Sequence, residues 1–131
     1  MFVDASAIVA ILVAEEDAAV LTKRLEQAKE AYTSPIALYE ATLGVSRAGN
    51  IAIAAAVVIL DRFVEQTGLR ILPIAAEIGR GALVAFERYG RGRHPAALNM
   101  GDCFAYACAR SLDMPLLCKG SDFPQTDIAI A

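Results

Sequence analysis

Short apolar runs separated by helical segments constrain the fold of this chain more than any other feature of its sequence. The runs lie at residues 1–3, 31–33, 69–72 and 116–118, and each ends at a polar, proline or turn-forming residue. Short strands that alternate with helices are typical of βα units and a parallel sheet. We therefore predict an α/β sandwich of modest size in which helix is the dominant element.

The predicted helices have recognisable ends. Ser34 and Pro35 supply an N-cap and a proline at the first helical position, and Asn99 can cap a later helix. Gly68 stops the apolar helix that precedes it. The expected helices cover residues 5–14, with a continuation or restart through 28, then 35 to about 49, 51–66, 75–89 and 100 to about 111, and a loop spans 90–99.

Composition favours one folded domain. The chain has 131 residues, is 56% hydrophobic and carries a formal net charge of -3. It can therefore bury a core, and it lacks the low hydrophobicity and high net charge that keep chains disordered. We predict a single domain over residues 1–131. The acidic balance argues weakly against a protein that coats nucleic acid through bulk charge.

No segment is expected to cross a membrane. The longest stretch without a charged residue, residues 48–60, is shorter than the ~18 residues that a spanning helix needs. The first ten residues lack the basic region of a signal peptide and include Asp4, so we expect a cytoplasmic protein. The three cysteines form no CxxC pair, which favours buried hydrophobic roles over a disulfide framework or a zinc site.

Four acidic residues stand at positions where a carboxylate is costly or where a parallel sheet places its ligands. Asp4 ends the first strand, and Asp122 follows the last strand after a short turn. Glu40 shares a helix face with apolar side chains, and Asp102 begins an apolar helix. Because ligands bind beyond the carboxyl ends of such strands, we expect one acidic pocket. Each acid also has a simpler interpretation. Asp4 would be a helix cap and Asp122 a turn residue, while Glu40 would form a buried ion pair and Asp102 would interact with the helix dipole.

The chemistry of such a pocket follows from its charge. Carboxylates held close together repel one another and either take up protons or hold a cation. Without histidine or thiol beside them, Mg²⁺ or Mn²⁺ is the favoured ion. Its usual work is to activate water and to clamp phosphate oxygens, so phosphodiester hydrolysis is the leading prediction. Ser6, two residues after Asp4, can orient a carboxylate or a bound water, or it can simply begin the helix.

Basic residues adjoin the acidic segments. Arg91 and Arg93 lie in the loop before Asp102, and Lys119 lies in the turn after the last strand. We expect these three to contact a nucleic-acid backbone, whereas the simpler alternative is a solvated loop. Two nearby titratable residues, His94 and Asp127, receive no role.

Several of these segments together resemble the PIN-domain ribonucleases of the VapC toxin family. The resemblance rests on VDASAI near the N-terminus, LYEATLG, GRGRHPAALNMGDCFAYACAR and LLCKGSDFPQTDI, and it spans essentially the whole chain. It implies a helix-rich, three-layer α/β/α PIN-like sandwich with a mainly parallel sheet of short strands. It also implies RNA cleavage that depends on Mg²⁺ or Mn²⁺, in a toxin held in check by an antitoxin.

The resemblance extends to individual residues. It implies that the catalytic and metal-binding acids are Asp4, Glu40, Asp102 and the more variable Asp122. Ser6 matches a small polar residue that supports the first acid, and Ser121 stands where the family often has an asparagine, in a similar supporting position. The family further implies a homodimer and a cognate VapB-type antitoxin whose C-terminal segment lies across the cleft.

Three other functions compete with this interpretation. A phosphatase of the haloacid dehalogenase type has a second aspartate two residues after the first, where this chain has Ser6. A receiver-type signalling domain needs an acid at the end of a middle strand, whereas the run 69–72 ends at Pro73. A catalytically inactive PIN-like module that binds RNA or its antitoxin would be expected to lose a core acid, and this chain has all four.

Overall fold

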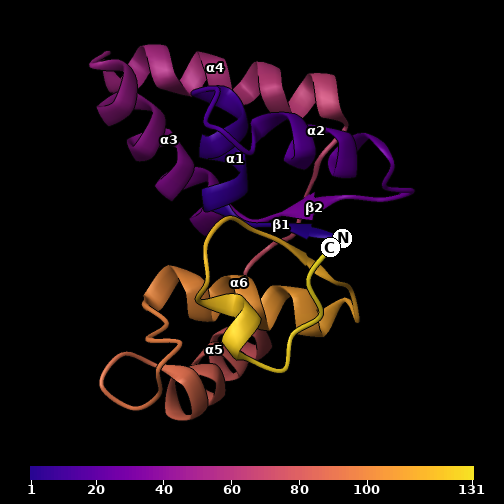
Figure 1. Cartoon of the computed structure of the whole chain (residues 1–131), viewed down its shortest axis with the longest axis vertical. Coiled ribbons are helices and arrows are strands. Elements are labelled where there is room, and N and C mark those ends of the chain that lie inside the picture. Colours follow the sequence, from indigo (N-terminus) through magenta and orange to yellow (C-terminus); the bar gives the residue numbers. More distant parts are fainter.

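A parallel sheet of four short strands, in the order β3-β2-β1-β4, lies at the centre of the molecule. The strands are β1 (Phe2–Val3), β2 (Tyr32–Thr33), β3 (Arg70–Ile71) and β4 (Leu116–Leu117). The computed structural model describes residues 1–131, and the sheet divides it into layers (Figure 1). The four strands lie in the four apolar runs, so the predicted strand positions are confirmed.

Helices cover both faces of the sheet (Figure 1). One layer contains α1 (Ala5–Leu12), α2 (Ala18–Glu26), α3 (Pro35–Gly49) and α4 (Ile53–Thr67). The other contains α5 (Ala76–Tyr89), α6 (Met100–Ser111) and the short 3₁₀ helix η1 (Phe123–Gln125). This arrangement confirms the predicted helix-rich α/β/α sandwich with a parallel sheet.

Each of the two layers has its own hydrophobic core, and the strands contribute to both. Phe2 and Leu116 pack with α5 and α6, whereas Val3 and Leu117 pack with the helices of the other layer. Because successive side chains of a strand point to opposite faces, two residues suffice for one side chain on each face. All four side chains are fully buried, so these very short strands still anchor both helix layers.

Local signals correctly place most helix ends. Ser34 caps α3 by accepting a hydrogen bond from the Ala37 amide (3.1 Å), and Asn50 ends that helix in the left-handed region at φ 47°. After α1 the chain turns through Ala14 at φ 55°, so α2 is a restart and not a continuation. The Ser46 hydroxyl donates to the Ile51 carbonyl (2.7 Å) and so ties Ile51 to the last turns of α3. The next helix, α4, therefore begins two residues later than expected.

The last residues of the chain return to the sheet, which the sequence did not predict. Ile130 forms an isolated parallel bridge with Leu116, and the Leu116 amide donates to the Ala129 carbonyl (2.8 Å). The C-terminal segment therefore borders β4. The three cysteines are buried and unpaired. None of the helices has the length and apolar character that crossing a membrane requires.

Candidate active site

Asp4 follows β1 directly and caps α1. Its amide donates to the Leu117 carbonyl (2.9 Å), which continues the pairing between β1 and β4. Its Oδ2 accepts hydrogen bonds from the Ser6 amide (2.9 Å) and the Ser6 hydroxyl (2.5 Å). The residue is only 4% exposed, and this burial raises the pKa of the Asp4 carboxyl despite the hydrogen bonds from Ser6.

Ser6 connects the ends of two neighbouring strands. Its hydroxyl donates to Asp4 and accepts a hydrogen bond from the Lys119 amide (3.0 Å), just after β4. Ser6 therefore both begins a helix and orients a carboxylate, so the two interpretations of this residue are not exclusive. The hydrogen bonds to Asp4 use Oδ2, and Oδ1 takes part in neither of them.

Glu40 comes from the middle of α3 and faces the start of α6. Its carboxylate lies against the Cα of Gly101, where no side chain intervenes. The pKa of Glu40 is raised to about 7, first by burial and then by the negative charges of Asp4 and Asp102. The Glu40 carboxyl group therefore lies close enough to Asp4 and Asp102 to interact with their charges.

Asp102 occupies the first turn of α6 and takes part in a capping box. Its Oδ2 accepts a hydrogen bond from the Asn99 amide (2.8 Å), while the Asn99 side chain accepts one from the Asp102 amide (3.0 Å). Burial raises the pKa of Asp102 to about 6, and the charges of Asp4 and Asp122 add to this. The amide of Asn99 and the charge of Arg91 act in the opposite direction.

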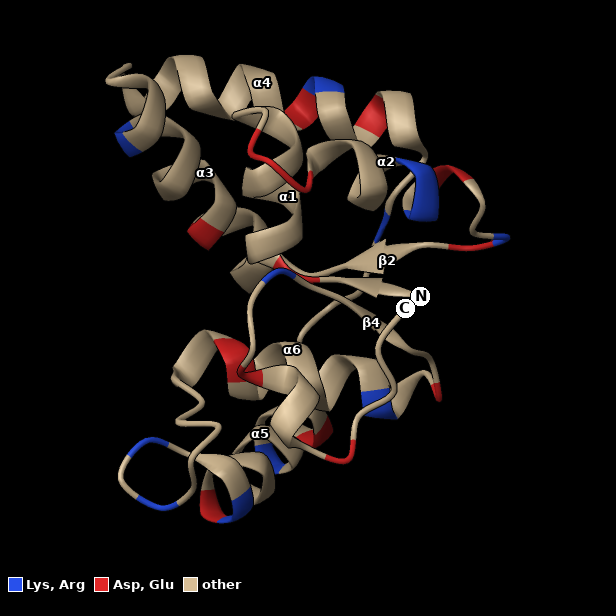
Figure 2. Cartoon of the chain, viewed as in Figure 1, with Lys and Arg blue, Asp and Glu red and all other residues tan.

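Three carboxylates from three elements thus repel one another at one edge of the sheet. Figure 2 shows acidic positions on α3 and at the start of α6 on the same side of the molecule. The donors are carboxylate oxygens, which suit a hard cation such as Mg²⁺ or Mn²⁺. As they lie in the structure, the His, Cys, Asp and Glu side chains form no group of three or more that could hold a metal ion, so binding a cation would require the carboxylates to move closer together.

Asp122 and Ser121 lie in the exposed turn between β4 and η1. The Asp122 carbonyl accepts a hydrogen bond from the Gln125 amide (3.1 Å), and the Ser121 carbonyl accepts one from the Gln125 side chain (3.0 Å). The charge of Asp122 reaches the pocket, because it raises the pKa of Asp102. For Ser121, these contacts involve the backbone and give no direct support to the acids.

The three candidate RNA-contacting residues have different surroundings. Arg91 is exposed and lies close enough to lower the pKa of Asp102. Arg93 lies over the ring of Phe86, 5.5 Å from its centroid. The Lys119 ammonium pairs with Glu15 and, at 3.4 Å, with Asp17, so it points toward the turn between α1 and α2.

His94 and Asp127 have structural contacts of their own. His94 Nδ1 accepts a hydrogen bond from the Ala96 amide (3.1 Å) inside the loop. Asp127 accepts one from the Tyr106 hydroxyl (2.5 Å) and lies 3.8 Å from the Arg88 guanidinium. These contacts fasten the loop before α6 and the segment after η1.

Sequence reasoning missed one residue of the site, Gly101. The available signal was a glycine in the first turn of a helix, where glycine is about 1 kcal/mol less favourable than alanine. The sequence also predicts Asn99 as a helix cap, but it does not reveal that the Asn99 amide donates a hydrogen bond to the Asp102 carboxylate.

Comparison with known proteins places the chain in a family. The PIN domain family matches residues 1–129, and a VapC ribonuclease of Rhizobium meliloti is 40% identical over 139 residues, covering 97% of this chain and 98% of the relative. The chain belongs to the VapC family of PIN-domain ribonucleases. Ribonuclease VapC42 of Mycobacterium tuberculosis is 39% identical over 129 residues and covers 98% of this chain and 96% of its own length.

A solved structure supports the same fold. The crystal structure of Mycobacterium tuberculosis VapC20, described as a toxin that cleaves the sarcin-ricin loop, has a TM-score of 0.78 and 16% sequence identity, and covers 99% of this chain and 97% of that one. The VapC resemblance and the interpretation as a ribonuclease of a toxin–antitoxin module are thereby confirmed. The phosphatase and receiver alternatives are set aside.

Proposed function

We propose that this VapC-family chain is an endoribonuclease that holds Mg²⁺ or Mn²⁺ between Asp4, Glu40 and Asp102, with Asp122 at the edge of the site. The observation that carries the proposal is that burial, and after it the negative charges of neighbouring acids, raises the pKa of Glu40 to about 7 and that of Asp102 to about 6. A divalent cation would offset both the burial of the charged carboxylates and their mutual repulsion. The oxygen-only donor set favours Mg²⁺ or Mn²⁺ over Zn²⁺.

The residues of the pocket have distinct tasks. Ser6 donates a hydrogen bond to Asp4, and the amide of Asn99 donates one to Asp102, so both carboxylates are held in defined orientations. The cation, when bound, supplies Lewis-acid polarisation of a phosphate oxygen and acidifies a water. Glu40 completes the ligand set from α3, where its carboxylate lies against Gly101.

The RNA backbone is proposed to cross the basic loop before α6. Arg91 is the first candidate, because its charge already reaches Asp102. Arg93 is exposed in the same loop. Lys119 is retained as a third candidate, although RNA would have to compete there with Glu15 and Asp17. Arginine and lysine side chains of this kind position a phosphate backbone and are insensitive to base sequence.

We further propose that the protein acts in the cytoplasm as a homodimer. The exposed apolar side chains of α5 and the start of α6 are the proposed dimer face: Leu83 is 71% exposed and Met100 67%, and Val84 and Phe86 are also exposed. These side chains are too apolar to be left in water without a cost.

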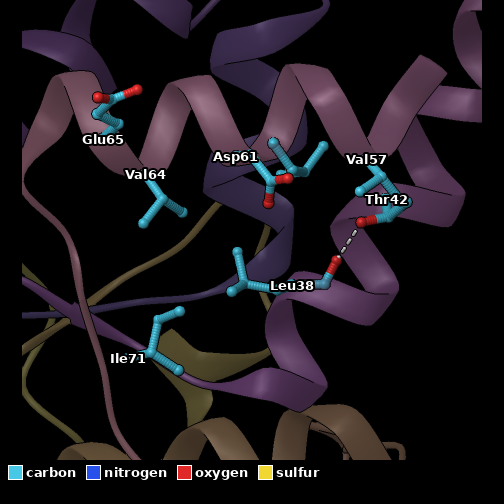
Figure 3. Close-up of a pocket in the computed structure, with 8 residues that line it drawn as sticks. Leu38, Thr42, Val57, Asp61, Val64, Glu65 and Ile71 are labelled. Atoms are coloured by element: carbon cyan, nitrogen blue, oxygen red, sulfur yellow. Dashed lines mark hydrogen bonds between the residues drawn. The ribbon is translucent and has the colours of Figure 1, made fainter. Parts of the chain in front are cut away.

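The other proposed partner is a VapB-type antitoxin, with its C-terminal segment across the acidic pocket and another of its segments in a groove between α3 and α4. The groove is lined by Leu38, Thr42, Val57, Leu60, Asp61, Val64, Glu65 and Ile71. Figure 3 shows apolar side chains from both helices and from β3 on its walls, with two acidic groups on α4. A segment with apolar and basic side chains complements this lining.

Cleavage of defined RNAs by the purified protein tests the proposed function. We expect cleavage with Mg²⁺ or Mn²⁺, none with EDTA, and a loss of at least about a hundredfold in Asp4→Asn. Asp113→Asn is the matched control, because Asp113 lies in an exposed turn after α6 at φ 51°, which asparagine also adopts. A protein that binds Mn²⁺ but cuts no RNA would favour the inactive PIN-like binding module.

A further inference from the structure

Gly101 lies in the first turn of α6, between Met100 and Asp102, and faces α3. A Cβ atom built at this position would overlap both carboxylate oxygens of Glu40 and its Cδ. Such approaches are far shorter than the ~3.5 Å of a relaxed van der Waals contact. The Glu40 carboxylate therefore occupies the space that any other residue at position 101 would fill.

We propose that Gly101 is a positioning residue: the absence of a side chain there creates the place in which the Glu40 carboxylate lies beside Asp4 and Asp102. The inference rests on the proposed function, because it concerns how one proposed cation ligand reaches the pocket. Gly101 has no positive φ angle, so backbone conformation does not require glycine here. Space for Glu40 accounts for a residue that is otherwise unfavourable in a helix.

The overlapping atoms decide what an alanine at position 101 would do. They belong to the end of a long, flexible side chain, which can swing toward solvent without moving the helices. Gly101→Ala should therefore keep the fold while expelling one carboxylate from the pocket. Gly49, the last residue of α3, offers a matched control, because a Cβ there would lie 3.7 Å from its nearest neighbour, Ile51.

The test is a double-mutant cycle read out as Mn²⁺ affinity in isothermal titration calorimetry. We expect Gly101→Ala to weaken Mn²⁺ binding at least about tenfold, to the same extent as Glu40→Ala. The double variant should bind no more weakly than Glu40→Ala alone, because both changes remove the same carboxylate. Gly49→Ala should bind Mn²⁺ as the wild type does.

Three results would overturn the proposal. Wild-type affinity in Gly101→Ala would show that Glu40 does not need this space. Losses that multiply in the double variant would show that Gly101 acts through something other than Glu40. An unfolding temperature of the cation-free protein far below that of Gly49→Ala would assign Gly101 to the packing of the fold.

A crystal structure of Gly101→Ala separates this inference from the proposed function. If the wild type binds no Mn²⁺, the proposed function fails, and the placement of Glu40 is still tested. We expect the Glu40 carboxylate to be turned out of the pocket in Gly101→Ala. A carboxylate in its original place, with α6 shifted instead, would contradict the inference.

Discussion

At the scale of single residues, the three core acids are held by different means. Ser6 donates a hydrogen bond to Asp4, and the amide of Asn99 donates one to Asp102. Gly101 has no side chain, which leaves room for the Glu40 carboxylate. Ser6 lies two residues after Asp4, and Asn99 and Gly101 lie within three residues of Asp102. All three of these partners are uncharged. The precision of the pocket therefore depends on small uncharged residues as much as on the carboxylates.

Ser6→Ala removes both the hydroxyl that donates to Asp4 and the acceptor of the Lys119 amide. We expect about tenfold weaker Mn²⁺ binding, and a free energy of unfolding lower by about 1–2 kcal/mol. Calorimetry and chemical denaturation measure the two effects. Ser111→Ala is the control, since its hydroxyl donates to the Cys108 carbonyl (2.8 Å) away from the acids. Equal Mn²⁺ affinity in Ser6→Ala and Ser111→Ala would refute a role for Ser6 in orienting Asp4.

The raised pKa values predict how the stability of the cation-free protein depends on pH. Glu40 and Asp102 have pKa values of about 7 and about 6 in the folded chain, above their ordinary 4.5 and 3.8. Between these limits the folded state binds more protons than the unfolded state, so the free energy of unfolding falls as the pH rises. We expect a higher unfolding temperature near about pH 5 than near about pH 7.5 in EDTA.

Two comparisons check the origin of this pH dependence. Glu40→Gln should flatten the decrease, because the amide does not titrate. Mn²⁺ should stabilise the protein more at the higher pH, since the carboxylates must lose protons to bind it. A decrease of equal size in Glu40→Gln would show that other groups cause it.

At the scale of elements, Asp4 and Asp102 lie at helix starts, whereas Glu40 lies in the middle of α3. α1 begins with Asp4 as its cap directly after β1, α3 begins with Ser34 directly after β2, and α6 begins with Asn99. The caps of α1 and α6 therefore decide where Asp4 and Asp102 are presented as well as where these helices start.

Asn99→Ala tests this double role of a cap. Ser34→Ala is the comparison variant, because Ser34 also caps a helix through its side chain but makes no hydrogen bond to a core acid. Both changes should lower the free energy of unfolding by about 0.5–2 kcal/mol. Asn99→Ala alone should also weaken Mn²⁺ binding, since the turn that fixes Asp102 is loosened. Weakening of equal size in Ser34→Ala would mean that general stability, and not the cap of α6, controls the site.

The sequence predicts the elements whose signals are local. Apolar runs, Ser34 with Pro35, and Asn99 each act over a few residues, and the structure confirms the strands and helices they predict. The interruption between α1 and α2 and the bridge from Leu116 to Ile130 depend on contacts made after folding. The four acids can be selected because carboxylates are costly at such positions, whereas the overlap of Glu40 with a Cβ at Gly101 joins helices distant in sequence.

At the scale of the whole molecule, the acidic pocket and the proposed dimer face meet at the start of α6, where exposed Met100 precedes Asp102 by two residues. The acidic pocket lies at one edge of the sheet, basic residues lie in the loop before α6, and apolar side chains are exposed on α5 and the start of α6. The pocket and the proposed dimer face nevertheless use different side chains.

A charged side chain on the proposed dimer face should produce monomers. Leu83→Glu places a carboxylate at the most exposed of the large apolar residues. We expect its sedimentation coefficient to fall to that of a monomer, because association would bury the new charge without a partner. Val58→Glu, at a 50% exposed apolar position on α4, should remain dimeric. A dimeric Leu83→Glu would assign the interface to another surface.

The central claim is that the three core carboxylates hold one catalytic cation, and anomalous diffraction from crystals soaked with Mn²⁺ tests it most directly. We predict a peak between Asp4, Glu40 and Asp102, at about 2.0–2.3 Å from their oxygens. The same soak of Asp4→Asn crystals should show a weaker peak or none. A peak elsewhere with this pocket empty, at Mn²⁺ concentrations that support RNA cleavage, would contradict the account.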